Sequence, residues 1–136
     1  MRILALVLAG GEGTRLHPLT AEHSKPALPF ANGYRIIDFA LSNLVNSGIC
    51  AIYVLAQYKP QSLIRHIESA WAPRLARKKG FIRAVLPRPD VGCGYFRGTA
   101  DAVYQNLDLI ELHKTDRKST RLNSSHWITS RMPSSA

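Results

Sequence analysis

Cysteine is scarce in this 136-residue sequence, which contains only Cys50 and Cys93. Two isolated cysteines have neither the spacing of a zinc site nor the number that a disulfide-stapled domain needs. They are typical of reduced thiols, and we expect a cytoplasmic location. No apolar run approaches the roughly 20 residues that cross a bilayer, so the sequence does not predict a membrane protein.

Acidic residues are also few, with nine Asp and Glu against 18 Lys and Arg and a formal net charge of +9. Four of the basic residues lie in residues 117–136, a segment without any acid. The moderate excess in the rest of the chain suits a site for phosphate-bearing small molecules as well as a weak polyanion surface. Because no basic stripe with interleaved aromatic residues occurs, we predict no nucleic-acid partner.

Apolar runs and helical periods alternate along the chain. The first run, residues 3–9, is at the short limit for a signal-peptide core, and a buried parallel strand ending at Gly10 is the favoured interpretation. Residues 51–56 and 81–86 predict two more strands. Apolar spacing predicts helices at residues 35–48, from 60 to about 71, and from an N-cap at Thr99 to about 113.

This alternation predicts an α/β fold: a Rossmann-like, doubly wound and mostly parallel sheet in residues 1–116. Residues 117–136 differ, because eight of the twenty are Ser or Thr and the apolar residues have no period. Their composition predicts a disordered tail. The order of its residues resembles translated sequencing-adapter read-through, and we favour that origin over a natural basic tail.

A glycine-rich loop follows the first strand, with Gly10, Gly11 and Gly13 ahead of Arg15. The spacing matches neither a dinucleotide fingerprint nor a P-loop. Glycines at the carboxyl end of a central strand let the backbone approach a ligand and direct N–H groups at phosphate oxygens. Arg15 adds a forked cation suited to phosphate. Taken alone, the loop is equally compatible with a glycine turn beside a surface arginine.

The longer context carries a family resemblance. The pattern Gly10-Gly11-x-Gly13-Thr14-Arg15-Leu16-x-Pro18-Leu19-Thr20, followed by Lys25-Pro26-Ala27, resembles the signature of sugar-1-phosphate nucleotidyltransferases. Residues 25–30, 34–43, 46–49, 57–58 and 97–103 are similar to ADP-glucose pyrophosphorylases. The resemblance implies a nucleotide-diphospho-sugar transferase fold and adenylyl transfer from ATP to glucose 1-phosphate, for glycogen or starch synthesis. Alternatives are a dTDP- or GDP-sugar enzyme and a non-catalytic nucleotide-binding module.

The same resemblance implies the site residues. Arg15 would neutralise the departing pyrophosphate, and Lys25 would lie near the reacting phosphates unless it pairs with a carboxylate. Gln57 would contact adenine. The implied nucleotide-binding residues are Leu8, Ala9, Gly10, Gly11, Gly13, Thr14, Gln57, Gly98, Thr99 and Ala100.

The resemblance implies further roles for Phe96 and Arg35. Phe96 stands where the family has a tyrosine associated with the glucose-phosphate pocket, so a hydroxyl is missing. Arg35 corresponds to a regulatory-site arginine in bacterial members, or is structural opposite Asp38. The Mg²⁺ ligand of the family lies in a later Gly-Asp-His segment that this sequence lacks. We therefore predict no metal ligand here, an incomplete catalytic domain and an inactive chain. The resemblance also implies a homotetramer for full-length members.

Overall fold

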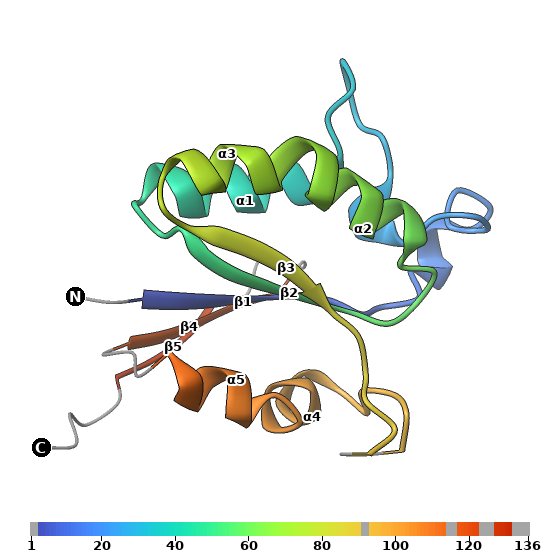
Figure 1. The fold of residues 1–136 in the computed structure, drawn as a ribbon. Coiled ribbons are helices and arrows are strands. Elements are labelled where there is room, and N and C mark those ends of the chain that lie inside the picture. The colour runs from blue at the N-terminus through green and yellow to red at the C-terminus, as the bar shows by residue number, and fades with distance from the viewer. Residues whose placement is uncertain (1–2, 91–92, 114–116, 123–126, 132–136) are drawn as a thin grey trace, which may run out of the picture.

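The computed structural model describes residues 3–90, 93–113, 117–122 and 127–131, the last two ranges as backbone only. They form a five-stranded sheet in the order β3-β2-β1-β4-β5, with helices on both faces (Figure 1). The strands β1, β2 and β3 span Ile3–Ala9, Ala51–Ala56 and Phe81–Val85 and pair in parallel. The predicted doubly wound, mostly parallel α/β fold is confirmed.

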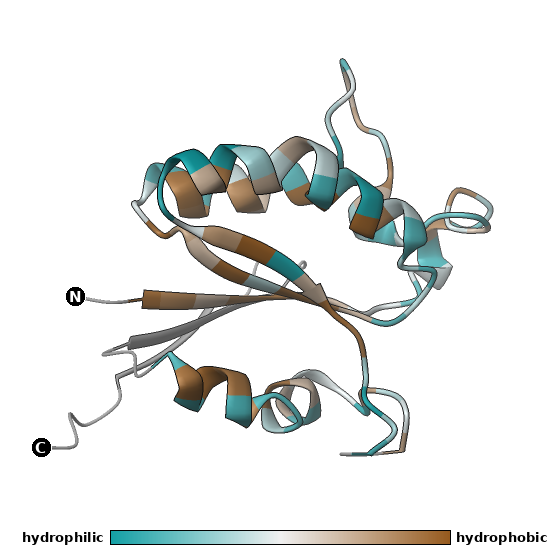
Figure 2. Cartoon of the chain, in the orientation of Figure 1, coloured by the Kyte–Doolittle hydropathy of each residue, from teal (hydrophilic) through white to brown (hydrophobic). Residues whose placement is uncertain are grey.

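The central strand β1 separates two cores. Ala5, Val7 and Ala9 point into the larger core, beneath the helices that lie above the sheet in Figure 1. Leu4, Leu6 and Leu8 point into the smaller core, toward the helices below it. Because successive strand side chains alternate between faces, a strand buried on both sides reads as one apolar run. Apolar residues accordingly line the inner surfaces of both helical layers (Figure 2).

The upper layer begins with α1 (Ile36–Asn46), which buries Ile37, Leu41 and Leu44 at three- and four-residue spacing. The next helical stretch is longer than predicted. It runs through α2 (Gln61–His66), the π-helical η3 (Ile67–Trp71) and α3 (Ala72–Arg77). Pro73 lies in the first turn of α3, where the missing N–H of a proline is least costly, and the helical stretch continues past it.

The lower layer is one predicted helix divided into two. The two parts, α4 (Thr99–Tyr104) and α5 (Leu107–Leu112), are separated at Gln105 and Asn106. The Asn106 side-chain amide donates to the Ala102 carbonyl at 2.8 Å, a bond that replaces helix bonding at the break. The predicted N-cap was wrong by one residue, since Gly98 is the N-cap and Thr99 is helical.

The predicted disorder of residues 117–136 is contradicted over two stretches. β4 (Arg117–Leu122) pairs in parallel with β1, and β5 (Trp127–Arg131) pairs antiparallel with β4. The edge of a strand has unpaired N–H and C=O groups, which can form hydrogen bonds with an extended segment nearby. The composition of that segment does not show whether such an edge is available. Residues 114–116, 123–126 and 132–136 lie outside the described residues, and the non-native origin of the tail stays a prediction.

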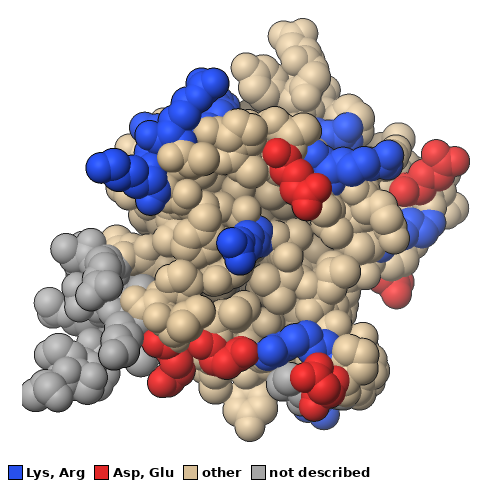
Figure 3. Space-filling view, viewed as in Figure 1, with Lys and Arg blue, Asp and Glu red and all other residues tan. Residues whose placement is uncertain are grey.

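Among the described residues, no helix combines the length and the apolar character that crossing a bilayer requires. On the face drawn in Figure 3, Lys and Arg are interrupted by uncharged surface and by acidic residues, rather than forming a continuous band.

Candidate functional site

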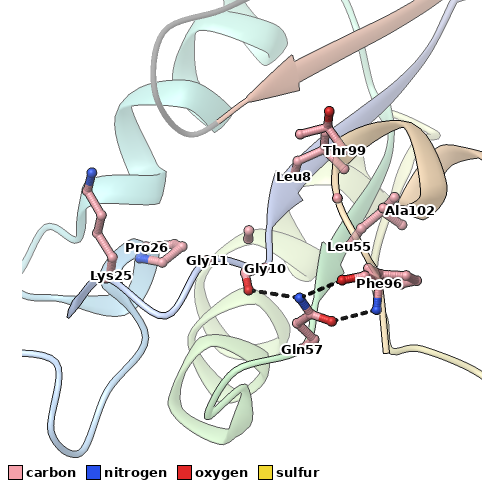
Figure 4. A pocket seen from close by; sticks show the side chains of 13 residues that line it. Leu8, Gly10, Gly11, Lys25, Pro26, Leu55, Gln57, Phe96, Thr99 and Ala102 are labelled. Atoms are coloured by element: carbon pink, nitrogen blue, oxygen red, sulfur yellow. Dashed lines mark hydrogen bonds between the residues drawn. The ribbon is translucent and has the colours of Figure 1, made fainter. Parts of the chain in front are cut away.

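A cleft of about 330 Å³ opens at the carboxyl ends of β1 and β2 (Figure 4). Its floor continues the lower core, since Leu8, Leu55 and Phe96 belong to both. In an open α/β sheet, this edge is where ligands bind. The lining consists of Leu8, Ala9, Gly10, Gly11, Gly13, Lys25, Pro26, Leu55, Gln57, Phe96, Gly98, Thr99 and Ala102.

One wall is the glycine loop, residues 10–13. Gly13 has a φ of 66°, and its carbonyl accepts a hydrogen bond from the Thr20 hydroxyl at 2.9 Å. A Cβ atom at Gly13 would lie 2.9 Å from Thr20 Cγ2 and 3.1 Å from Lys25 Cβ. Gly11 is the opposite case, because a Cβ built there meets nothing within 4 Å. The loop is therefore closed behind Gly13 and open at Gly11, where a ligand can approach the backbone.

The other wall is the segment of residues 95–99, called the 95–99 loop, which ends at Thr99, the first residue of α4. Gln57 joins the two walls. Its Nε2 donates to the Gly10 carbonyl at 3.2 Å and to the Phe96 carbonyl at 3.3 Å, while its Oε1 accepts from the Phe96 amide at 2.7 Å. These bonds use both amide hydrogens and leave one acceptor position on Oε1. The side chain at the end of β2 thus fixes the width of the cleft (Figure 4).

The two predicted catalytic cations are placed differently. Lys25 lines the cleft from the 3₁₀-helix η2 (Lys25–Ala27). Arg15 lies on the 3₁₀-helix η1 (Thr14–Leu16), directly after the glycine loop, where it is exposed and outside the lining. Arg15 is therefore a cation of the surface next to the loop rather than of the cleft floor.

Nine of the predicted nucleotide-binding and catalytic residues are brought together by the fold. Thr14, Arg15 and Ala100 are not in the lining. Sequence reasoning missed Pro26, Leu55 and Ala102 as lining residues. The sequence could have indicated two of them as lining residues. Leu55 shares a strand face with Gln57, and Ala102 is one helical turn beyond Thr99.

Phe96 is 6% exposed, and its ring packs in the lower core while its backbone bonds Gln57. Its predicted contact with a sugar phosphate stays a prediction. The missing hydroxyl suits the surroundings of the ring, because a buried hydroxyl requires a hydrogen-bond partner.

Arg35 and Asp38 tie α1 to its neighbours. The Arg35 guanidinium donates to the Ala27 carbonyl, and its amide donates to Asp38 Oδ2 at 2.8 Å. Asp38 Oδ1 lies 2.6 Å from His66 Nε2 and accepts from Trp71 Nε1 at 2.7 Å. Burial alone raises the pKa of Asp38, but these hydrogen bonds hold it below its ordinary value. The geometry supports a structural role for both residues, and the regulatory role of Arg35 stays a prediction.

No group of three His, Cys, Asp or Glu side chains in the described part of the chain is arranged to hold a metal ion. The residues described as lining the cleft likewise include no carboxylate.

The sequence matches the nucleotidyl transferase family over residues 4–135. The glucose-1-phosphate adenylyltransferase of Thermodesulfovibrio yellowstonii is 53% identical over 115 residues, covering 85% of this chain and 28% of that protein. The protein of the same name in Paenarthrobacter aurescens is 56% identical over 110 residues, which cover 80% of this chain and 23% of that protein. The Thermus thermophilus protein of the same name is 51% identical over 117 residues, covering 83% and 28%.

The chain thus spans about a quarter of the length of these curated relatives. The stretch that matches the family, residues 4–135, contains the glycine loop, Lys25, Gln57 and the 95–99 loop, which are the parts that build the cleft. The family expected from the sequence motifs is confirmed: this chain belongs to the nucleotidyl transferases.

Proposed function

We propose that the chain supplies the nucleotide cleft of a glucose-1-phosphate adenylyltransferase, with residues 1–116 forming the N-terminal part of its catalytic domain. In that reaction a phosphate oxygen of glucose 1-phosphate bonds to the α-phosphorus of ATP. The bond from that phosphorus to the oxygen bridging to the β-phosphate breaks, and pyrophosphate leaves. The observation that carries the proposal is a two-walled cleft at the carboxyl ends of β1 and β2 in a chain half identical to enzymes of that name.

The glycine loop supports the triphosphate part of the proposal. Gly11 leaves its backbone open to the cleft, and Gly10 packs against Gln57, with a built Cβ 3.3 Å from Gln57 Cγ. Backbone N–H groups in such a loop make favourable partners for phosphate oxygens. Lys25 adds a positive charge on the lining, and Arg15 adds a second one on the adjoining surface. Two cations beside a polyanion stabilise charge that moves onto pyrophosphate.

The state of the Gln57 amide supports an adenine base. Its two hydrogens are held by the Gly10 and Phe96 carbonyls, so Gln57 can meet a base only through the remaining acceptor position on Oε1. An acceptor suits the exocyclic amino group of adenine and opposes the keto oxygen of guanine at the equivalent position. The apolar side chains of Leu8, Leu55 and Ala102 provide the floor for a base.

Magnesium is the expected ion for this chemistry, acting by neutralising phosphate charge. The described lining does not fit it, since carboxylates are the usual protein ligands of Mg²⁺ and none is among these residues. No catalytic step is assigned to the ion here. The remaining expectations are glucose 1-phosphate as the second substrate, a homotetramer in full-length members, and a cytoplasmic location.

Nucleotide competition tests the proposal on the 136-residue chain. Equilibrium dialysis with labelled ATP, competed by GTP and by dTTP, should show saturable ATP binding and weaker displacement by the two keto bases. Equal displacement by all three would refute the adenine assignment, and no ATP binding would refute the nucleotide site. With ATP, glucose 1-phosphate and Mg²⁺ present, we expect no steady pyrophosphate release, and steady release would mean that the chain needs no further carboxylate.

A further inference from the structure

The 95–99 loop is held in place by side chains of other elements. The Tyr95 carbonyl accepts from Gln105 Nε2 at 3.0 Å, and the Arg97 amide donates to Asp101 Oδ2 at 2.9 Å. Between them, Phe96 bonds Gln57 through both its amide and its carbonyl. Three consecutive backbone units of this wall thus depend on three side chains, of which only Gln57 lines the cleft.

Asp101 is the junction of these bonds. Its carboxylate accepts from the Arg97 amide, from the Arg97 guanidinium at 3.3 and 3.4 Å, and from Gln105 Nε2 at 2.8 Å. The Arg97 amide and then its guanidinium hold the pKa of Asp101 below the ordinary value, so the carboxylate is ionised near neutral pH. A charged acceptor makes these bonds stronger than neutral ones.

Gln105 extends the same support toward α5. It is 4% exposed, and its Nε2 bonds both Tyr95 and Asp101. The backbone carbonyl of Gln105 accepts a hydrogen bond from the Arg88 guanidinium at 2.9 Å. Arg88 also pairs with Asp108 at 3.0 Å. At the break between α4 and α5, the Gln105 backbone is therefore held by Arg88, and its side chain is held through Nε2 alone, since its buried Oε1 has no hydrogen-bond partner among the described residues.

We propose that Asp101 and Gln105 are positioning residues, which hold the 95–99 loop at the distance from the glycine loop that a nucleoside triphosphate requires. This inference rests on the proposed function. Neither residue touches the cleft, and both act through the Tyr95 carbonyl and the Arg97 amide. Their loss displaces the wall that carries Phe96, Gly98 and Thr99 and leaves the glycine loop in place.

The experiment measures two ligands on the 136-residue chain, ATP and inorganic tripolyphosphate. The variants are Asp101→Ala, Asp101→Asn and Gln105→Met. Glu111→Gln is the control, because it removes an exposed carboxylate of α5 that, in the described part of the chain, bonds neither residues 95–99 nor Arg88. We expect Asp101→Ala to weaken ATP binding about tenfold, as the loss of charge-assisted hydrogen bonds predicts, with tripolyphosphate binding changed less than about twofold. Asp101→Asn keeps an acceptor for the Arg97 amide and should restore part of the ATP affinity.

Amide hydrogen exchange of residues 95–99 gives a readout independent of any ligand. It should accelerate at Phe96 and Arg97 in Asp101→Ala and Gln105→Met and stay unchanged in Glu111→Gln. If the wild-type chain binds no ATP, the proposed function fails. If it binds ATP and both variants bind it equally well, only the positioning role fails. An equal loss of ATP and tripolyphosphate binding would also overturn it, because that pattern indicates general unfolding.

Discussion

The two walls of the cleft are built by different means. The glycine loop depends on backbone conformation, with Gly13 at a φ of 66° and one hydrogen bond from the buried Thr20 hydroxyl. The 95–99 loop depends on side chains, namely Gln57, Asp101 and Gln105. The first wall should therefore fail when a Cβ atom is added, and the second when a polar side chain is removed.

The largest effect is expected at Gly13. Gly13→Ala forces a residue with a side chain into the left-handed region, at a strain on the order of 1–3 kcal/mol. Crowding against Thr20 and Lys25 adds about 1–3 kcal/mol. Urea unfolding of the 136-residue chain measures the sum. Gly48→Ala is the control, because Gly48 has a φ of 79° and open space around its Cβ position. Equal losses in the two variants would mean that crowding at Gly13 contributes nothing.

A second prediction concerns the charge beside the glycine loop. Arg15→Ala should weaken ATP binding by about tenfold or more, since a hydrogen bond to a charged group contributes roughly 1.5–3 kcal/mol. Arg15→Lys should restore little of this, because lysine keeps the charge and loses the fork. Stability should not change, as Arg15 is exposed. Undiminished ATP affinity in Arg15→Ala would remove this residue from the site.

The link between the walls is the next target. Gln57→Met keeps the length of the side chain and removes all three hydrogen bonds, which leaves the Phe96 amide and the Gly10 carbonyl without that partner. We expect a loss of about 1–3 kcal/mol in unfolding free energy. ATP binding should fall further than in Asp101→Ala, because both walls lose a contact. A variant as stable as the wild type would show that the two walls hold their spacing independently.

Gly11→Ala sharpens the comparison within the glycine loop. The added methyl group stands in open space and at ordinary φ, so the unfolding free energy should change by less than about 0.5 kcal/mol. The methyl group occupies room that the phosphates need, and we expect ATP binding to weaken about tenfold, the effect of roughly 1.4 kcal/mol. Unchanged binding would place the phosphates away from Gly11.

Sequence patterns predicted most of the fold, and the motifs predicted nine of the residues that line the cleft. The apolar runs predicted the strands, because a strand that is covered on both faces consists almost entirely of apolar residues. The glycine loop was recognisable because its glycines stand close together directly after an apolar strand. The hydrogen bonds that hold the 95–99 loop could not be predicted from the sequence. They come from Gln57, which is distant in sequence, and from Asp101 and Gln105, which look like ordinary helix residues.

The errors have the same origin. The length of the helix through Pro73 and the break at Asn106 depend on a π turn and on one side-chain bond, which no period encodes. The strand at residues 117–122 depends on a free edge of β1, a property of the sheet rather than of the segment.

The smallest expected effect is an acid titration that separates the two walls. The pKa of Asp101 in the folded chain is lowered by the Arg97 amide and guanidinium, so its contribution is complete above the unfolded-state pKa of about 3.9. That contribution disappears as the pH falls through the lower folded-state pKa. In the glycine loop, the bond between Thr20 and Gly13 involves no titrating group.

Following backbone amide chemical shifts by NMR from pH 6 downward should therefore show an inflection at Arg97 below about 3.9, and none at Gly13 until the whole chain unfolds. Asp101→Asn is the control and should abolish the inflection at Arg97. The carboxylate of Asp38, whose pKa is also lowered, lies between α1 and the stretch of α2 and η3. Its titration should move the amide of Arg35, from which it accepts a hydrogen bond, in wild type and variant alike. An Arg97 amide that ignores pH, or that moves together with Gly13, would mean that the two walls form one unit and that Asp101 holds neither of them separately.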